Sequence, residues 1–164
     1  MNQNARYRLL ILFVLLAFAV PFTLAGDTLI NRTPAAVPVP TPASVTPPYD
    51  NYKGVTVGMT ADKARAALGS PKDSSAESEL WVFSNSETVQ LYYDAAKLVT
   101  AISITYSGKL GAAPTPKIIF GEEAEVKPDG GIFKMVRYPK AGFWISYNKI
   151  GGDEPMVMIA IQKM

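Results

Sequence analysis

The chain has 164 residues, of which 16 are Lys or Arg and 14 are Asp or Glu, so its formal net charge is +2. Two of the basic residues, Arg6 and Arg8, lie near the N-terminus, and the remaining charges balance, which leaves no electrostatic footprint for nucleic acid. The chain has neither cysteine nor histidine, which excludes disulfides, metal sites built on thiolate or imidazole, and Ser-His or Cys-His nucleophile systems.

Residues 1–25 have the pattern of an export signal. Two arginines precede an unbroken apolar run over residues 9–20, Pro21 ends the run, and small residues before Gly26 offer a cleavage site. As a helix this run would span about 18 Å, less than the roughly 30 Å hydrocarbon core of a membrane. We therefore expect a cleaved signal peptide, with an uncleaved N-terminal membrane anchor as the alternative.

Residues 26–48 predict a linker, because six of the sixteen residues from 33 to 48 are proline. Proline disfavours both helices and sheet ladders, so we expect an extended, disordered tether with polyproline II character. The alternative is a proline-rich ligand for a partner domain. A tether of this kind is most useful if its far end is held in a membrane.

Residues 49–164 have the composition of one globular domain, and its first predicted element is a short helix. Thr60 is a good N-cap, and alanines recur at helical spacing from Ala61 to Leu68 with charged residues on the opposite side. Gly69 ends the helix, and Pro71 prevents it from resuming.

Three predicted strands follow the helix, over residues 80–83, 88–93 and 98–106. In the last of them Ile102, Ile104 and Tyr106 alternate with smaller or polar residues. Because the turns between the strands are short, the three strands predict an antiparallel meander.

The second half of the domain resembles the first at an offset of about 52–57 residues. Residues 117–121 resemble the end of the first helix, and three more strands are predicted over residues 134–138, 143–148 and 156–162. We interpret this as two helix-plus-three-strand repeats in one antiparallel sheet, an α+β fold. The alternative is that two unrelated meanders look alike.

The segment from Val57 to Thr60, the Leu-Gly-Ser-Pro sequence after the helix, and the strand motifs around Trp81 and Leu91 together resemble a known family. They are similar to the BamE/SmpA/OmlA-type small outer-membrane-assembly lipoproteins, within the β-lactamase-inhibitor-protein-like (BLIP-like) fold. The resemblance covers residues 57–106 and implies short helices packed on an antiparallel sheet. Members of that family carry a lipidated cysteine and are usually shorter, whereas this chain has no cysteine.

Two sequence patterns resemble a catalytic motif and a metal-binding loop, and neither predicts a functional site. Ser146 and Lys149 match the S-x-x-K motif of penicillin-recognising enzymes, but Ser146 falls in a predicted strand and the accompanying K-T-G and S-D-N elements are missing. Glu122, Glu123, Glu125 and Asp129 form an acidic loop with no EF-hand spacing, which is typical of a solvated charge run. The sequence therefore assigns no catalytic, cofactor-binding or metal-binding residue.

The aromatic residues of the predicted strands offer the candidate binding site. Period-two alternation places Tyr92 opposite Leu91 and Tyr93, and Trp144 opposite Phe143, Ile145 and Tyr147. We expect Tyr92 and Trp144 to fall together on one sheet face, either packed in the core or exposed as a patch that binds a partner.

These observations favour a non-enzymatic protein-binding domain of the cell envelope, periplasmic or secreted, or tethered to the inner membrane if the first segment is retained. The expected partner is another envelope protein, with membrane contact only through the N-terminal segment and no nucleic acid. The alternatives are an inhibitor of an extracytoplasmic enzyme, a binder of a small apolar ligand, and a hydrolase that uses carboxylates.

Overall fold

The computed structural model describes residues 47–164, so the predicted signal or anchor and most of the predicted linker lie outside the described residues. The elements, in chain order, are β1 (Asn51–Tyr52), β2 (Val55–Thr56), α2 (Ala61–Leu68), β3 (Asp73–Ser74), β4 (Ser78–Ser84), β5 (Glu87–Tyr93), β6 (Val99–Ser107), the 3₁₀ turn η2 (Leu110–Ala112), α3 (Pro116–Phe120), β7 (Ile132–Tyr138), β8 (Phe143–Ile150) and β9 (Met156–Lys163). Within this part of the chain, no helix is long and apolar enough to cross a membrane.

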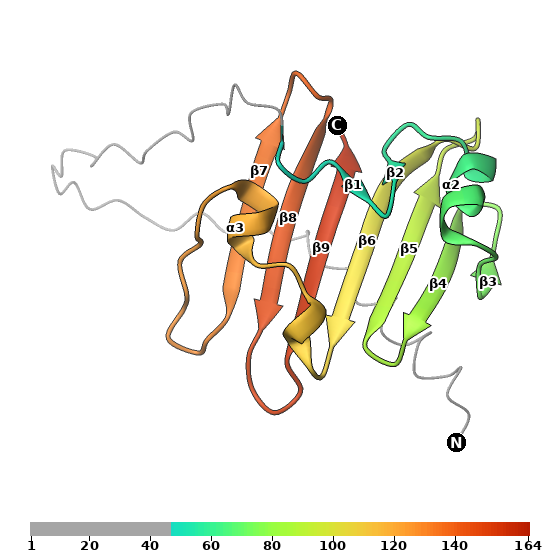
Figure 1. The fold of residues 1–164 in the computed structure, drawn as a ribbon. Coiled ribbons are helices and arrows are strands. Elements are labelled where there is room, and N and C mark those ends of the chain that lie inside the picture. The colour runs from blue at the N-terminus through green and yellow to red at the C-terminus, as the bar shows by residue number, and fades with distance from the viewer. Residues whose placement is uncertain (1–46) are drawn as a thin grey trace, which may run out of the picture. The chain divides into compact units, whose positions relative to one another are not determined.

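Strands β3 to β9 form one seven-stranded antiparallel sheet in the order β3-β4-β5-β6-β9-β8-β7 (Figure 1). Each predicted meander is present, and the two meanders meet through their last strands, because β6 pairs with β9. The antiparallel sheet with short helices is therefore confirmed. The helices contribute only eight and five residues, so the described part is mostly β rather than an even mixture of helix and strand.

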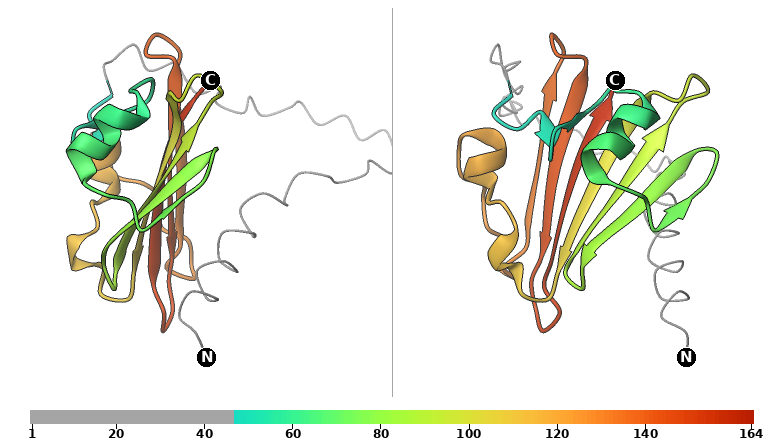
Figure 2. Two further views of the ribbon diagram at one scale, coloured as in Figure 1. Left: turned by 90° about the vertical axis from the view of Figure 1, so that its right-hand side faces the viewer. Right: turned by 45° about the vertical axis from the view of Figure 1, so that its right-hand side comes forward.

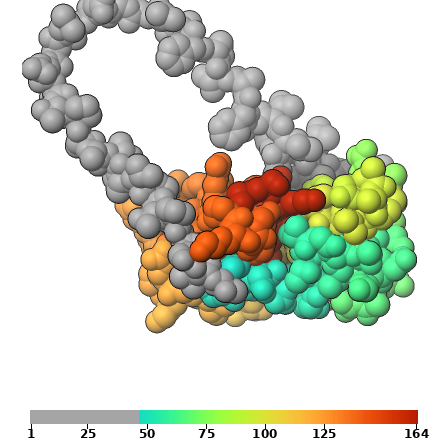
Figure 3. All heavy atoms as spheres, turned by 90° about the horizontal axis from the view of Figure 1, so that it is seen from above, coloured from blue at the N-terminus to red at the C-terminus, as the bar shows by residue number. Residues whose placement is uncertain are grey.

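Both helices lie on the same face of the sheet, and no described element covers the other face (Figure 2). Helix α2 lies over β4 and β5, α3 lies over β7 and β8, and the small β1–β2 hairpin lies between them (Figure 1). Seen from above, the hairpin and α2 form a continuous layer along one side of the sheet (Figure 3). The described domain thus has two layers and one buried sheet face.

The core lies between this layer and the helix-facing side chains of the sheet. Alternation along each strand sends every second residue inward, as in the fully buried Val89 and Leu91 of β5. The covering layer contributes Val55, Ala64 and Ile119, which are also fully buried. Each large aliphatic side chain buried in this way contributes about 1.5–3 kcal/mol.

Glycines end both helices where the sequence predicts it. Gly69 follows α2 with φ of 84°, and Gly121 follows α3 with φ of 78°, conformations that side-chain-bearing residues avoid. The carbonyl of Gly69 accepts a hydrogen bond of 2.9 Å from the indole Nε1 of Trp81. The helix end is therefore joined directly to the outer part of the sheet.

An ion pair joins each half of the covering layer to the sheet. Arg65 of α2 donates to the carboxylate of Glu79 on β4. Lys134 of β7 donates to the carboxylate of Glu122, which follows α3, at 2.7 Å. In the first pair the covering layer supplies the cation and the strand supplies the carboxylate. In the second pair the strand supplies the cation and the covering layer supplies the carboxylate.

Candidate functional site

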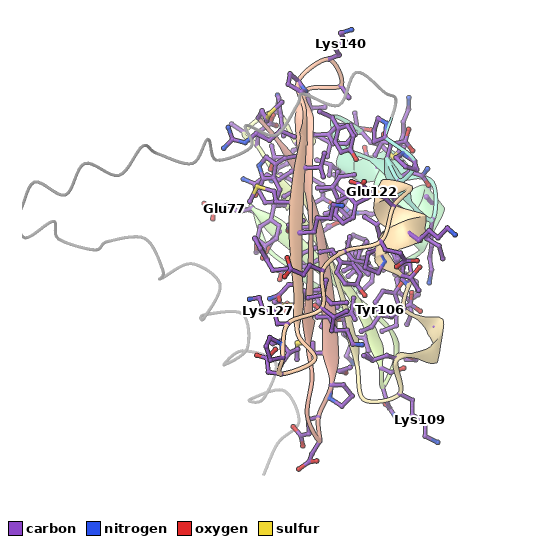
Figure 4. The ribbon with its side chains drawn as sticks, turned by 90° about the vertical axis from the view of Figure 1, so that its left-hand side faces the viewer. Glu77, Tyr106, Lys109, Glu122, Lys127 and Lys140 are labelled. Carbon is purple, nitrogen blue, oxygen red and sulfur yellow. The ribbon has the colours of Figure 1, made fainter. Side chains whose placement is uncertain are left out.

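The sheet has two faces of opposite character, and the uncovered one is the candidate site. Figure 4 views the sheet from its β7 edge, with Tyr106 and Glu122 on the helix side and Glu77 and Lys127 on the other side. We call this other side the open face. The register defines three rows of side chains across it: Ser78, Tyr92, Ala101, Gln162, Trp144, Arg137; Leu80, Gln90, Ser103, Ala160, Ser146, Met135; and Val82, Thr88, Thr105, Met158, Asn148, Phe133.

The three rows of the open face carry almost no charge. Among the eighteen residues of the three rows, Arg137 is the only one with an ionised side chain. Small side chains fill the middle of the second row, where Ser103, Ala160 and Ser146 lie on adjacent strands. Larger apolar and aromatic side chains stand on both sides of them. A surface of this composition suits a weakly charged partner surface.

Tyr92 and Trp144 both lie on the open face, and both are half-buried rather than part of the core. They share the first row, but Ala101 and Gln162 lie between them. Three strand spacings of about 4.8 Å place their backbones roughly 14 Å apart. They share a face as expected, and they also share a row, but they are not in direct contact because β6 and β9 separate the strands that carry them.

Four other aromatic residues of the strands pack in the core, whereas Phe83 is 37% exposed at the end of β4. Trp81, Tyr93, Phe143 and Tyr147 all point toward the helices and are buried. Burial raises the pKa of the Tyr93 hydroxyl, and its hydrogen bond to Glu79 raises it further. These residues shape the sheet from behind and do not reach the open face.

Several exposed apolar residues of the open face were not predicted from the sequence. Phe133 and Met135 are 56% and 46% exposed on β7, and Val82 is 38% exposed on β4. The signal for the first two was present, because Phe133, Met135 and Arg137 alternate with helix-facing residues along β7. The predicted strand begins at residue 134 and therefore does not include Phe133.

The S-x-x-K pair does not form a catalytic unit. Ser146 lies on the open face, whereas Lys149 is three residues further along β8 and therefore points to the helix side. Within residues 47–164, no group of three acidic side chains could hold a metal ion. Glu122 of the acidic loop is engaged by Lys134.

The one buried carboxylate of the described residues is fully engaged by the fold. Glu79 is 1% exposed and accepts hydrogen bonds from Arg65, from the Ser74 hydroxyl at 3.0 Å and from the Tyr93 hydroxyl at 2.8 Å. Burial by itself would raise the pKa of Glu79, but the bonds from Arg65, Tyr93 and Ser74 outweigh it and hold this pKa below its ordinary value. A carboxylate with a lowered pKa and no free lone pair toward solvent suits structure rather than proton transfer.

A second polar cluster lies around Glu87, at the start of β5. Its carboxylate accepts hydrogen bonds from the hydroxyls of Tyr52 at 2.8 Å and Tyr106 at 3.3 Å, and Lys53 lies 3.3 Å away. The Lys53 ammonium also stands 3.6 Å from the centre of the Phe83 ring. These contacts join the β1–β2 hairpin to the sheet, again on the helix side.

The described residues also form a cleft of about 440 Å³ at the end of β8, where Lys127, Asp129, Asn148 and Lys149 are among its lining residues. Trp144 lies at the opposite end of the same strand. Charged or polar side chains and glycines make up most of the lining, with Ile132 and Ile150 as its only large apolar residues, so the cleft does not resemble the apolar pockets that hold small hydrophobic ligands.

Comparison with known proteins gives no relative on which to base a function: no family model, no curated protein and no solved structure matches the chain.

Proposed function

We propose that residues 49–164 form a non-enzymatic domain that acts outside the cytoplasm and binds another envelope protein through the open face of its sheet. The observation that carries the proposal is the open face itself, which combines half-buried Tyr92 and Trp144 with exposed Phe133 and Met135 and has one charged side chain in its three rows. Exposed aromatic and apolar residues on a nearly uncharged surface are typical of protein interfaces.

The sequence of the first 48 residues supports a location outside the cytoplasm. Residues 1–25 have the pattern of a signal peptide or membrane anchor, and the proline-rich residues 26–48 would act as a tether. A domain on such a tether can reach a partner at some distance from its anchor. The resemblance of residues 57–106 to the BamE/SmpA/OmlA-type lipoproteins points in the same direction and favours an accessory or scaffold of envelope assembly.

The finer fold, two helix-plus-three-strand repeats of BLIP-like type, is part of the same proposal. The strand order reads the same from both sides of the β6–β9 junction, apart from the additional β3. At that junction Ser103 pairs with Ala160, which is 57 residues further along the chain and matches the offset seen in the sequence. The ion pairs Arg65–Glu79 and Glu122–Lys134 are a further correspondence between the halves.

The test is a cross-linking capture with the full chain as bait in native envelope extract. We expect one stoichiometric protein partner, and we expect Tyr92→Ala and Trp144→Ala to reduce its capture while the far-UV circular dichroism stays unchanged. Ile118→Ala is the matched control, since Ile118 is an exposed apolar residue on the helix side. Equal capture by all variants, or no partner with the unaltered chain, would overturn the proposal.

A further inference from the structure

The two edges of the sheet differ in how they are protected. On one side the two-residue β3 pairs with Glu79 and Leu80 of β4, and the β4 register shifts between Val82 and Ser84. On the other side β7 pairs along its whole length with β8 and has no second strand. Its outer side meets the rest of the described chain only at the isolated bridge between Val126 and Ile132. Beyond this bridge the edge has no partner strand among the described residues, and a free strand edge is a template for pairing with another chain.

The turn before β7 shows which backbone groups point outward. The carbonyl of Gly131 accepts a hydrogen bond from the amide of Lys127, in the connection outside the edge. Because backbone groups alternate in direction along a strand, the amides and carbonyls of Phe133, Met135 and Arg137 also point away from β8. Figure 4, seen from this edge, shows the connection passing from Glu122 on the helix side to Lys127 on the open side. The bridge between Val126 and Ile132 sets Phe133 beside Glu125, and no backbone hydrogen bond of the described residues reaches the outward groups of Met135 and Arg137.

The side chains of this edge do not discourage pairing. Phe133 and Met135 are exposed apolar residues on the open face. Lysine on an edge strand normally opposes association, but the ammonium of Lys134 is held by the carboxylate of Glu122 at 2.7 Å and lies 5.4 Å from the centre of the Phe120 ring. Arg137 remains as the only other charge on the strand.

We propose that β7 pairs with β7 of a second copy of this chain, antiparallel about a two-fold axis at Met135. On the open face this register places Met135 against its own copy and Phe133 against the partner's Arg137, so that each guanidinium stacks on an aromatic ring. On the helix face the stem of Lys134 lies against the partner's Val136. The same patch serves both copies, as a two-fold interface requires.

Neighbouring registers are less favourable, which is why the axis falls at Met135. A two-fold axis at residue 134 would place the two copies of Lys134 opposite each other, and an axis at residue 137 would do the same with Arg137. Like charges directly opposite each other destabilise a ladder. An axis at residue 136 places Phe133 opposite Pro139, which has no amide hydrogen to donate. The edge is therefore more complementary to itself in one register than in the others.

The consequence is one continuous sheet with a doubled open face. Trp144 pairs with Arg137 within each copy, so the aromatic row of one copy would continue through Arg137 onto the partner's Phe133. This pairing shares Phe133 and Met135 with the proposed partner-binding face but does not use Tyr92 or Trp144, so Tyr92→Ala and Trp144→Ala leave the edge contact intact.

The chain has no cysteine, so one introduced cysteine reports one contact. We would express the full chain carrying Met135→Cys in an export-competent host, oxidise the cells with copper phenanthroline and separate the products without reductant. We expect a disulfide-linked dimer, because two residues at a two-fold axis face each other across the ladder. Val82→Cys, equally on the open face but at the opposite edge of the sheet, measures random collision.

Charge substitutions at Phe133 test the register without disturbing an inward-facing residue. In the Met135→Cys chain, Phe133→Lys opposes Arg137 of the partner and should lower the dimer yield about tenfold, whereas Phe133→Glu pairs with that arginine and should preserve it. A Met135→Cys yield no higher than that of Val82→Cys would overturn the dimer. Equal yields for the lysine and glutamate variants would overturn the register.

Discussion

Glu79 is the only charged side chain that the described residues bury, and its neighbours make this possible. Its two oxygens accept four hydrogen bonds, of which Arg65 supplies two. A glutamine has only one acceptor oxygen and cannot satisfy the same donors. We expect Glu79→Gln to lower the free energy of unfolding by about 1–3 kcal/mol, measured by urea denaturation at neutral pH.

Glu77 provides the matched control, because it lies two residues earlier and its side chain is exposed. Glu77→Gln should leave the unfolding midpoint unchanged. If Glu79→Gln proves equally silent, the buried network does not join α2 to β4 with the strength that its contacts indicate.

The two tryptophans provide opposite optical reports. Trp81 is 2% exposed and donates its indole N–H to the Gly69 carbonyl, whereas Trp144 is half-buried on the open face. We expect Trp144→Phe to shift the emission maximum to the blue and to remove most of the quenching by acrylamide. Trp81→Phe should do the reverse in a chain that remains folded. Strong quenching that survives Trp144→Phe would show that Trp81 is accessible to the quencher and would contradict its burial.

At the scale of the elements, local signals predict much of what the structure shows. Thr60, Gly69 and Pro71 predict the bounds of α2, and alternation predicts the strands from β4 to β9 to within a few residues. The two-residue strands β1, β2 and β3 were not predicted, because two residues are too few to carry a period. These pieces depend on tertiary contacts, such as the pairing of Asp73 with Leu80.

The loop between β8 and β9 packs closely against the turn before β7, and Gly151 is the point of closest approach. A Cβ added at Gly151 would lie 2.8 Å from the backbone oxygen of Asp129, a distance that requires the backbone to move. We expect Gly151→Ala to destabilise the domain by about 1–3 kcal/mol through this overlap. The measurement is the thermal unfolding midpoint by circular dichroism.

Gly111 isolates the effect of space from that of glycine flexibility. It has no positive φ, and an added Cβ would meet no atom within 4 Å. Gly111→Ala should therefore be neutral or slightly stabilising, because alanine reduces the freedom of the unfolded chain. Similar losses at both glycines would show that the contact with Asp129 is not the cause.

At the scale of the whole molecule, sequence patterns do not predict the order of the strands in the sheet. Alternation predicts which face of the sheet a side chain occupies, so the shared face of Tyr92 and Trp144 could be predicted from the sequence. Their separation depends on β6 pairing with β9, a contact between residues 49 to 61 positions apart. The same long-range pairing leaves β7 at an edge, and so exposes Phe133 and Met135.

The stability of the molecule should be nearly flat in the neutral range and fall at both extremes of pH. The chain has no histidine and no cysteine, so apart from the terminal amino group few groups titrate near neutrality. The pKa of Glu79 is lowered in the folded state despite its burial, so its contribution is present above the ordinary value of 4.5 and is lost as the pH falls below it.

At alkaline pH, stability falls as the pH rises, which we call the alkaline limb, because folding raises the tyrosine pKa values; the fall at acid pH is the acid limb. Burial, with the nearby Glu87 carboxylate, raises the pKa of Tyr49 to about 12, and burial with the same carboxylate raises that of Tyr106. Their contribution is complete below the ordinary value of 10 and is lost as the pH rises above it, since the unfolded chain then releases protons that the folded chain retains.

Urea denaturation from pH 3 to pH 11 measures both limbs on one chain. We expect Tyr106→Phe to flatten the alkaline limb alone, whereas Glu79→Gln should flatten the acid limb and also part of the alkaline limb, because Glu79 raises the pKa of Tyr93. A steep slope between about pH 6 and pH 9 would contradict this account, since the chain has neither histidine nor cysteine, the side chains whose ordinary pKa values fall there.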